Sequence, residues 1–192
     1  MLLTDVDGFN HTADRAGVTS SVLLLHTFGA ALGDALDAPR VPVTVPVSYR
    51  PTESTPGAGS VEVLGNFTHL ETVTVEADDV PERTGAQLWD RVGQGAGTAP
   101  APVAGRGDHR IVFTSTLGLD YSTTDAALEP VWSLTATPGV LIDCQVLDHP
   151  DGIEIRWDHP ESVLDEAFLD HAERRFAERL GLITAPSEPP AS

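Results

Sequence analysis

The chain has 192 residues, 41% of them hydrophobic, which is enough apolar material for one domain of ordinary size with its own core. Its 11 Lys and Arg residues against 29 Asp and Glu residues give a formal net charge of −18. This charge excludes DNA and RNA as primary partners, because nucleic-acid binding relies on a basic surface. The one cysteine, Cys144, excludes an internal disulfide framework and every zinc motif built on several cysteines.

The first strong pattern along the chain is helical. After Thr19, a good N-cap residue, apolar residues recur at helical spacing as far as about Asp37. Residues 41–47 alternate Val with Pro or Thr, which predicts a strand at a sheet edge or with a bulge. Residues 52–59 have the composition of a surface loop.

The middle of the chain predicts a broken strand, a helix and a linker. Residues 61–75 have strand composition interrupted near Gly65. Residues 81–92 predict a short helix with Leu88 and Trp89 on its apolar side. Residues 93–107 are rich in Gly, Ala and Pro, which is typical of a linker or a mobile loop.

The last third predicts strands followed by a closing helix. The segments with strand composition are residues 110–116, 132–135, 140–147 and 153–157. Helical periodicity returns over residues 163–180, and residues 186–192 are a polar tail. We therefore predict one layered α/β domain over residues 1–182 and a disordered tail over residues 183–192.

The sequence shows neither a membrane span nor a secretion signal. No apolar run approaches the ~18 residues that a span needs, and residues 1–9 carry acidic side chains where a signal peptide has basic ones. We expect a cytoplasmic protein that has no membrane partner.

Asp143 is the most unusual residue in the predicted strands. It lies on the less apolar side of residues 140–147, together with Gln145, and its neighbours in the chain are apolar. Burial there would raise its pKa and let it both donate and accept a proton near neutrality. Thr114 lies on the corresponding side of residues 110–116. The alternative is a structural acid that hydrogen-bonds a loop or an Arg, which is the commoner case.

Other candidates are weaker. The 7 histidines show no paired spacing on a common helix face, so we expect no metal site. His26 fits a satisfied core residue, and Cys144 a small hydrophobic one. No Gly-x-Ser-x-Gly turn makes a nucleophile of Ser21 or Ser115.

Four motif-like segments follow one another along the chain: VTSSVLL at 18–24, GNFTHL at 65–70, IVFTSTL at 111–117 and TPGVLID at 137–143. Asp143 is then followed, after 13 intervening residues, by Trp157-Asp158. Together these features resemble the C-terminal half of the heterocyclization domains of nonribosomal peptide synthetases, which are relatives of condensation domains. The matching family motifs are a Thr-Pro-Ala-rich helix start, GDFTxL, VVFTSxL, and TPQVxLD followed at that spacing by Trp-Asp.

The resemblance covers residues 18–182 and has departures. Asn66 stands where the family has Asp, and Gly139 where it has Gln. The signatures of the family's N-terminal lobe, DxxxxDxxS or HHxxxDG, do not occur. The chain therefore looks like one lobe that opens on its own Met1.

The resemblance implies a chloramphenicol-acetyltransferase-like lobe, with a mixed sheet packed with helices. It implies condensation and cyclodehydration of a carrier-bound Cys, Ser or Thr with an acyl donor, which gives a thiazoline or an oxazoline. Asp143 and Thr114 take the proton-transfer roles, and Gln145 and Ser115 are expected to bind substrate. Trp157 and Asp158 are expected to support the fold. No cofactor is expected on this chain, and the phosphopantetheine arm of a carrier protein is the substrate tether.

The resemblance also implies partners. These are carrier proteins and a separately encoded N-terminal lobe in a heterodimer, without which we expect no activity. Three alternatives stay open: a non-catalytic scaffold or docking lobe of a synthetase assembly, half of an amide-forming condensation domain, and an isolated acyltransferase-like enzyme.

Overall fold

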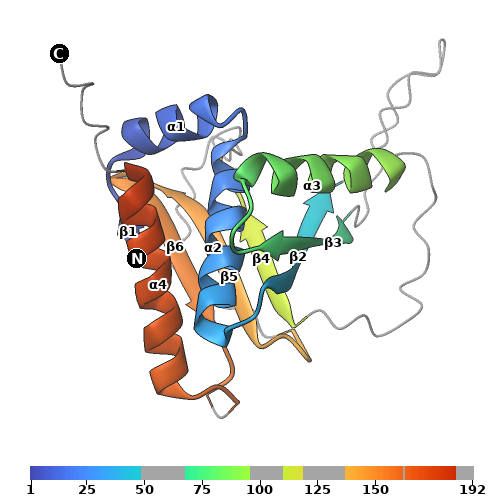
Figure 1. The fold of residues 1–192 in the computed structure, drawn as a ribbon, viewed down its shortest axis with the longest axis vertical. Helices are drawn as coiled ribbons and strands as arrows, with labels where there is room; N and C mark the ends of the chain where they lie inside the picture. Colours follow the sequence, from blue (N-terminus) through green and yellow to red (C-terminus); the bar gives the residue numbers. More distant parts are fainter. Residues whose placement is uncertain (49–67, 96–109, 119–136, 162, 185–192) are drawn as a thin grey trace, which may run out of the picture.

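The computed structural model describes residues 1–48, 68–95, 110–118, 137–161 and 163–184, which form one sheet and four helices (Figure 1). The helices are α1 (Val6–Arg15), α2 (Ser20–Leu36), α3 (Pro81–Gly95) and α4 (Glu166–Thr184). The strands are β1 (Leu2–Leu3), β2 (Arg40–Ser48), β3 (Thr68–Glu76), β4 (Ile111–Ser115), β5 (Ile142–His149) and β6 (Gly152–Asp158).

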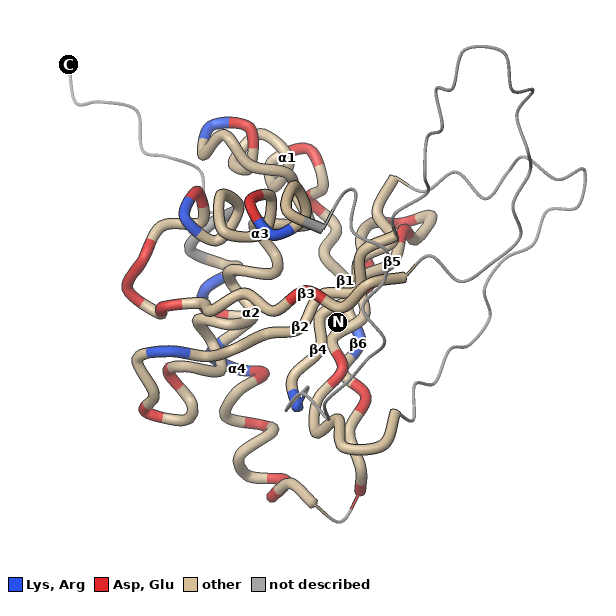
Figure 2. Tube along the Cα trace, turned by 90° about the vertical axis from the view of Figure 1, so that its right-hand side faces the viewer, with Lys and Arg blue, Asp and Glu red and all other residues tan. Residues whose placement is uncertain are grey.

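The sheet is mixed and has the strand order β1-β6-β5-β4-β2-β3. β4 runs parallel to both of its neighbours, β2 and β5, and the other neighbouring pairs are antiparallel. Figure 2, turned by 90° from Figure 1, shows that the described helices lie on one side of the sheet. The described residues thus form a two-layer structure, and the predicted α/β fold with a mixed sheet is confirmed.

Helix α2 is the centre of the helical layer and matches its prediction. The Thr19 hydroxyl accepts a hydrogen bond from the Val22 backbone N–H at 3.2 Å, which caps the helix start. The helix ends at Asp37, whose φ of 49° is left-handed. Near this end, Arg179 of α4 donates two hydrogen bonds to the Asp34 carboxylate, at 2.8 and 2.9 Å. This bidentate pair ties α2 to α4 and lowers the pKa of Asp34.

The first elements of the chain, β1 and α1, are not predicted by the sequence pattern. The Asp5 carboxylate caps α1 by accepting a hydrogen bond from the Gly8 N–H at 3.0 Å. Only Phe9 and Ala13 are buried in this helix, which is too sparse a pattern to reveal its period.

None of the described helices is long and apolar enough by itself to cross a membrane. One pair, α1 with α2, passes that test of length and composition together, with a bend of 88° between the two helices.

The prediction for residues 41–47 is half right. The segment is a strand, but β2 lies inside the sheet, between β4 and β3, so the expected edge position is wrong. β2 pairs with β3 along its whole length, whereas its register with β4 is Thr44 opposite Val112. Pro42 and Pro46 have no N–H to donate. Because the pairing with β4 is at Thr44, midway between them, both prolines can be accommodated inside the sheet.

The prediction for residues 81–92 also needs one correction. The helix exists and continues to Gly95. Leu88 is buried in the core, but Trp89 is 54% exposed, so the two residues do not share a buried face. The predicted strand at 132–135, the loop at 52–59 and the tail at 186–192 lie outside the described residues, as does most of the 93–107 linker.

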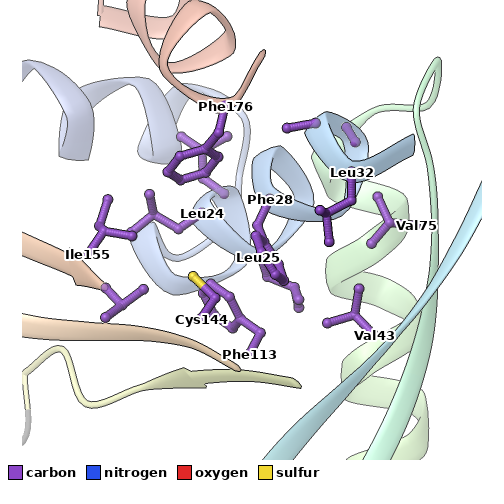
Figure 3. Packing of buried hydrophobic residues seen from close by; sticks show 14 of the residues in the cluster. Leu24, Leu25, Phe28, Leu32, Val43, Val75, Phe113, Cys144, Ile155 and Phe176 are labelled. Atoms are coloured by element: carbon purple, nitrogen blue, oxygen red, sulfur yellow. The ribbon is translucent and has the colours of Figure 1, made fainter. Parts of the chain in front are cut away.

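The core is built around Phe28 of α2, which is completely buried. Its ring lies 5.1 Å from that of Trp157, 6.0 Å from Phe113 and 6.5 Å from Phe176, measured between ring centroids. Figure 3 shows Phe28, Phe113 and Phe176 among the buried side chains between the helices and the sheet, with Cys144 beside Phe113. Residues from one helix and two strands therefore converge on this side chain of α2.

His26 links α2 to α3, as expected of a satisfied core residue. Its Nδ1 lies 2.9 Å from the Thr84 hydroxyl oxygen, and the side chain is buried. Burial, followed by the positive charge of Arg179, lowers the pKa of His26 below its ordinary value of 6.5. The folded protein therefore favours the neutral ring.

This lowered pKa predicts a pH-dependent stability. The unfolded chain takes up a proton at His26 more readily than the folded one, so stability is full above the ordinary pKa of 6.5 and falls as the pH drops toward the lowered value. The loss is at most about 1.4 kcal/mol per pH unit, the limit for one proton. Urea denaturation of the wild type and of His26→Gln between about pH 7 and 5 measures it, because the variant lacks this contribution. Parallel pH profiles for the two proteins would contradict the assignment.

Candidate functional site

Three of the four predicted site residues share the sheet face opposite the helices. Side chains alternate along a strand, and Phe113 of β4 and Cys144 of β5 point into the helical core. Thr114, Asp143 and Gln145 are their neighbours in the chain, so they point to the other face. The parallel register sets Thr114 directly opposite Gln145 and places Asp143 one step back along β5. The strand register therefore brings Thr114, Asp143 and Gln145 together on one face of the sheet.

The carboxylate at the centre of this face is deeply buried. Asp143 is 3% exposed and Gln145 5% exposed, while Thr114 is half-buried. Across the antiparallel pair, Asp143 lies opposite Asp158 of β6. Asp143 and Asp158 are therefore cross-strand neighbours on the same face of the sheet.

Gln145 is fixed by the second carboxylate. Its Nε2 donates a hydrogen bond to Oδ2 of Asp158 at 2.9 Å. Asp158 was expected to support the fold with Trp157, but the structure separates the two. Trp157 packs in the core against Phe28 and Phe176, and Asp158 lies on the site face. The separation of Trp157 from Asp158 follows from the alternation of side chains along β6, since adjacent strand residues point to opposite faces.

Arg156 is a cation on this face, and it is paired with Glu154. Arg156 lies opposite Gln145 in the register of β5 and β6. Its Nε and Nη2 donate to the two carboxylate oxygens of Glu154, both at 2.8 Å. This pairing raises the pKa of Arg156 and lowers that of Glu154. Both carboxylate oxygens of Glu154 therefore accept hydrogen bonds from the Arg156 guanidinium group.

Ser115 lies apart from the other three predicted residues. It is on the helical side of β4, and its Oγ is 2.8 Å from Oγ of Ser21 in the first turn of α2. Ser21 in turn lines a cavity of about 710 Å³ at the carboxyl ends of β4 and β5, along with Leu117 and His149. A role for Ser115 in substrate binding stays a prediction.

Cys144 is excluded as a nucleophile by its surroundings. The side chain is completely buried, and burial raises the pKa of its thiol well above the ordinary value. The thiol therefore stays protonated and packs as a small hydrophobic group, as the sequence predicts. Among the described residues, no three His, Cys, Asp or Glu side chains are grouped so as to hold a metal ion.

The geometry has a known counterpart among solved structures. The chain aligns with the nonribosomal peptide synthetase FmoA3, as its S1046A variant, at 22% identity and a TM-score of 0.73, covering 97% of this chain and 21% of that one. It aligns with the EpoB cyclization-docking bidomain from Sorangium cellulosum at 19% identity and a TM-score of 0.68, covering 94% and 40%. It aligns with the chain-releasing condensation domain of the enacyloxin polyketide synthase at 13% identity and a TM-score of 0.64, covering 100% and 42%.

These alignments show that the chain shares its fold with parts of condensation and cyclization domains, which confirms the predicted chloramphenicol-acetyltransferase-like fold. No family model matches the sequence. A sequence relative is the pyochelin synthetase PchF of Pseudomonas aeruginosa, strains UCBPP-PA14 and PAO1, which is 27% identical over 205 residues. The alignment covers 93% of this chain and 10% of the relative, so the chain spans about a tenth of the length of the curated relatives it matches.

Proposed function

We propose that this lobe supplies the proton-transfer residues of a heterocyclization site, which forms a thiazoline or an oxazoline from a carrier-bound Cys, Ser or Thr and an acyl donor. The observation that carries the proposal is the common face of Thr114, Asp143 and Gln145, with Asp143 only 3% exposed. The likeness to a cyclization-docking bidomain and to a pyochelin synthetase supports it.

The proposed chemistry makes definite demands on this face. After the amine of the Cys, Ser or Thr is acylated, its side-chain sulfur or oxygen attacks the new amide carbonyl and closes a five-membered ring. The former carbonyl oxygen then leaves as water while the ring nitrogen loses its proton, and a C=N bond forms. The step therefore needs an acid beside the leaving oxygen and a base beside the ring N–H.

The described residues can meet these demands. A buried carboxyl group at Asp143 can give a proton to the leaving oxygen and take one back from nitrogen. The Thr114 hydroxyl, on the adjacent strand, can position a water molecule or the leaving group. Gln145 is held by Asp158 and would orient the intermediate. The dehydration balances without an oxidant or a reductant.

The proposed partners are carrier proteins, whose phosphopantetheine arm would hold the substrate, and a separately encoded N-terminal lobe. The sequence contains neither signature of that lobe. The described residues place proton-transfer groups on one side of the proposed site, and a second lobe would supply the opposite wall of the substrate channel.

Reconstitution tests this function. The chain, a candidate N-terminal lobe encoded beside it, and the two loaded carrier proteins are mixed, and the carrier-bound products are weighed by mass spectrometry. We expect a stable hetero-oligomer by size exclusion with light scattering, and a product lighter than the amide by one water. If the chain stays monomeric and does not bind the second lobe at micromolar concentration, the proposal is contradicted. An amide that never loses water would favour a plain condensation lobe.

A further inference from the structure

A small groove with an apolar floor lies between α3 and the corner at which α1 meets α2, where Figure 1 shows the loop between these helices beside the N-terminal end of α3. Its volume is about 420 Å³. The residues that line it are Asp14, Gly17, Val18, Thr19, Glu82, Gly85, Ala86 and Trp89. The groove belongs to the helical layer, so it is separated by the sheet from the face that carries Asp143.

Trp89 is the distinctive side of this groove. It is 54% exposed, and it is the one aromatic residue among the exposed large hydrophobic residues of the described chain. Glu82, Gly85, Ala86 and Trp89 follow one another at helical spacing, so they form a single stripe along α3. At Gly85 a Cβ atom would lie 3.2 Å from Cγ1 of Val22, so the close approach of α3 to α2 depends on a small residue there.

The rim of the groove is acidic and unneutralised. Among the described residues, neither Asp14 nor Glu82 has an ion-pair partner. The cation next to Glu82 in the chain, Arg83, is bound to Asp79 at 3.1 Å. Trp89 and two acidic residues therefore line the same groove as Val18 and Ala86, on a chain whose net charge is −18.

We propose that this groove docks a basic segment of a partner protein by receiving an arginine side chain. A guanidinium group is planar and weakly hydrated, so it can stack on the Trp89 ring while its N–H groups reach the carboxylates of Asp14 and Glu82. An apolar residue beside that arginine would cover Val18 and Ala86. An acidic segment is disfavoured by the rim and by the net charge of the chain. The proposal does not depend on the proposed function.

Peptide binding tests this docking site. The probe is a short capped peptide with two arginines flanked by leucines, and its matched partner carries citrulline, which has the same shape without the charge. Titration calorimetry with the full chain measures both. We expect the arginine peptide to bind about 10-fold more tightly than the citrulline peptide. Trp89→Ala and the double variant Asp14→Asn/Glu82→Gln should each weaken it by about 5- to 10-fold, and Trp89→Phe by less.

The control is a second double variant, Asp78→Asn/Asp170→Asn, which removes two exposed acids away from the groove. It should change the affinity by less than about 2-fold. Equal losses from both double variants would overturn the proposal, because they would indicate unspecific charge attraction. Equal binding of the two peptides, or no binding of either, would overturn it as well. Circular dichroism of each variant verifies that these surface changes leave the fold intact.

Discussion

Replacing Asp143 by Asn is expected to suppress ring formation by about 10²-fold or more, the scale for removing a positioned proton-transfer group. The carboxamide has nearly the same volume as the carboxyl group but cannot transfer a proton. The hydrogen bond from Gln145 to Asp158 stays available, so the neighbouring strand contacts are preserved. Because acylation precedes dehydration, the uncyclised amide should accumulate on the carrier protein, where mass spectrometry detects it.

Thr114 supplies the matched pair of variants. Thr114→Ala removes the hydroxyl and should also leave uncyclised amide, whereas Thr114→Ser keeps the hydroxyl and should retain most ring formation. Azoline at the wild-type level from both Asp143→Asn and Thr114→Ala would show that these residues are structural. If the amide is lost together with the ring, their role belongs to condensation and the assignment to cyclodehydration is wrong.

The site face could be predicted because strand alternation is a short-range rule. In residues 140–147 it sets Asp143 and Gln145 apart from Cys144, and the structure places them on opposite faces of β5. The same rule puts Ser115 on the side of Phe113, which is where it lies. The substrate-binding role given to Ser115 came from the motif resemblance, which lists residue types and does not encode the face on which each one lies.

The contacts between strands were not predictable in the same way. Asp158 lies opposite Asp143 only because β6 turns back antiparallel beside β5 with one particular register. Register depends on the turn between the strands and on the whole buried face, so a single sequence does not reveal it. The interior place of β2 has the same origin. Its prolines favour an edge locally, but two neighbours with complementary apolar faces outweigh that preference.

Helix α2 was predictable for the opposite reason. Its cap, its apolar period and its left-handed end are all local features, and they agree with one another. α1 lacks such agreement, since it buries two residues and depends on tertiary contacts for the rest of its stability. Trp89 shows a further limit, because an aromatic residue at helical spacing indicates a core position only where a neighbour covers it.

Phe28→Ala is expected to lower the free energy of unfolding by about 3–5 kcal/mol, the range for deleting a buried aromatic side chain. Phe28 is completely buried, and the rings of Phe113, Trp157 and Phe176 surround it. These rings come from β4, β6 and α4, so they cannot all move inward to fill the space without shifting the sheet against the helices. Urea denaturation followed by circular dichroism measures the change.

Leu36→Ala is the control, since Leu36 lies on the same helix and is 49% exposed. It should lower the free energy of unfolding by less than about 1 kcal/mol, because a half-exposed side chain loses little apolar contact. The difference between the two variants separates the packing of Phe28 from any general cost of placing Ala in α2, where Ala itself favours the helix. Similar losses from both variants would mean that the packing of Phe28 against the rings of Phe113, Trp157 and Phe176 does not hold the helical layer to the sheet.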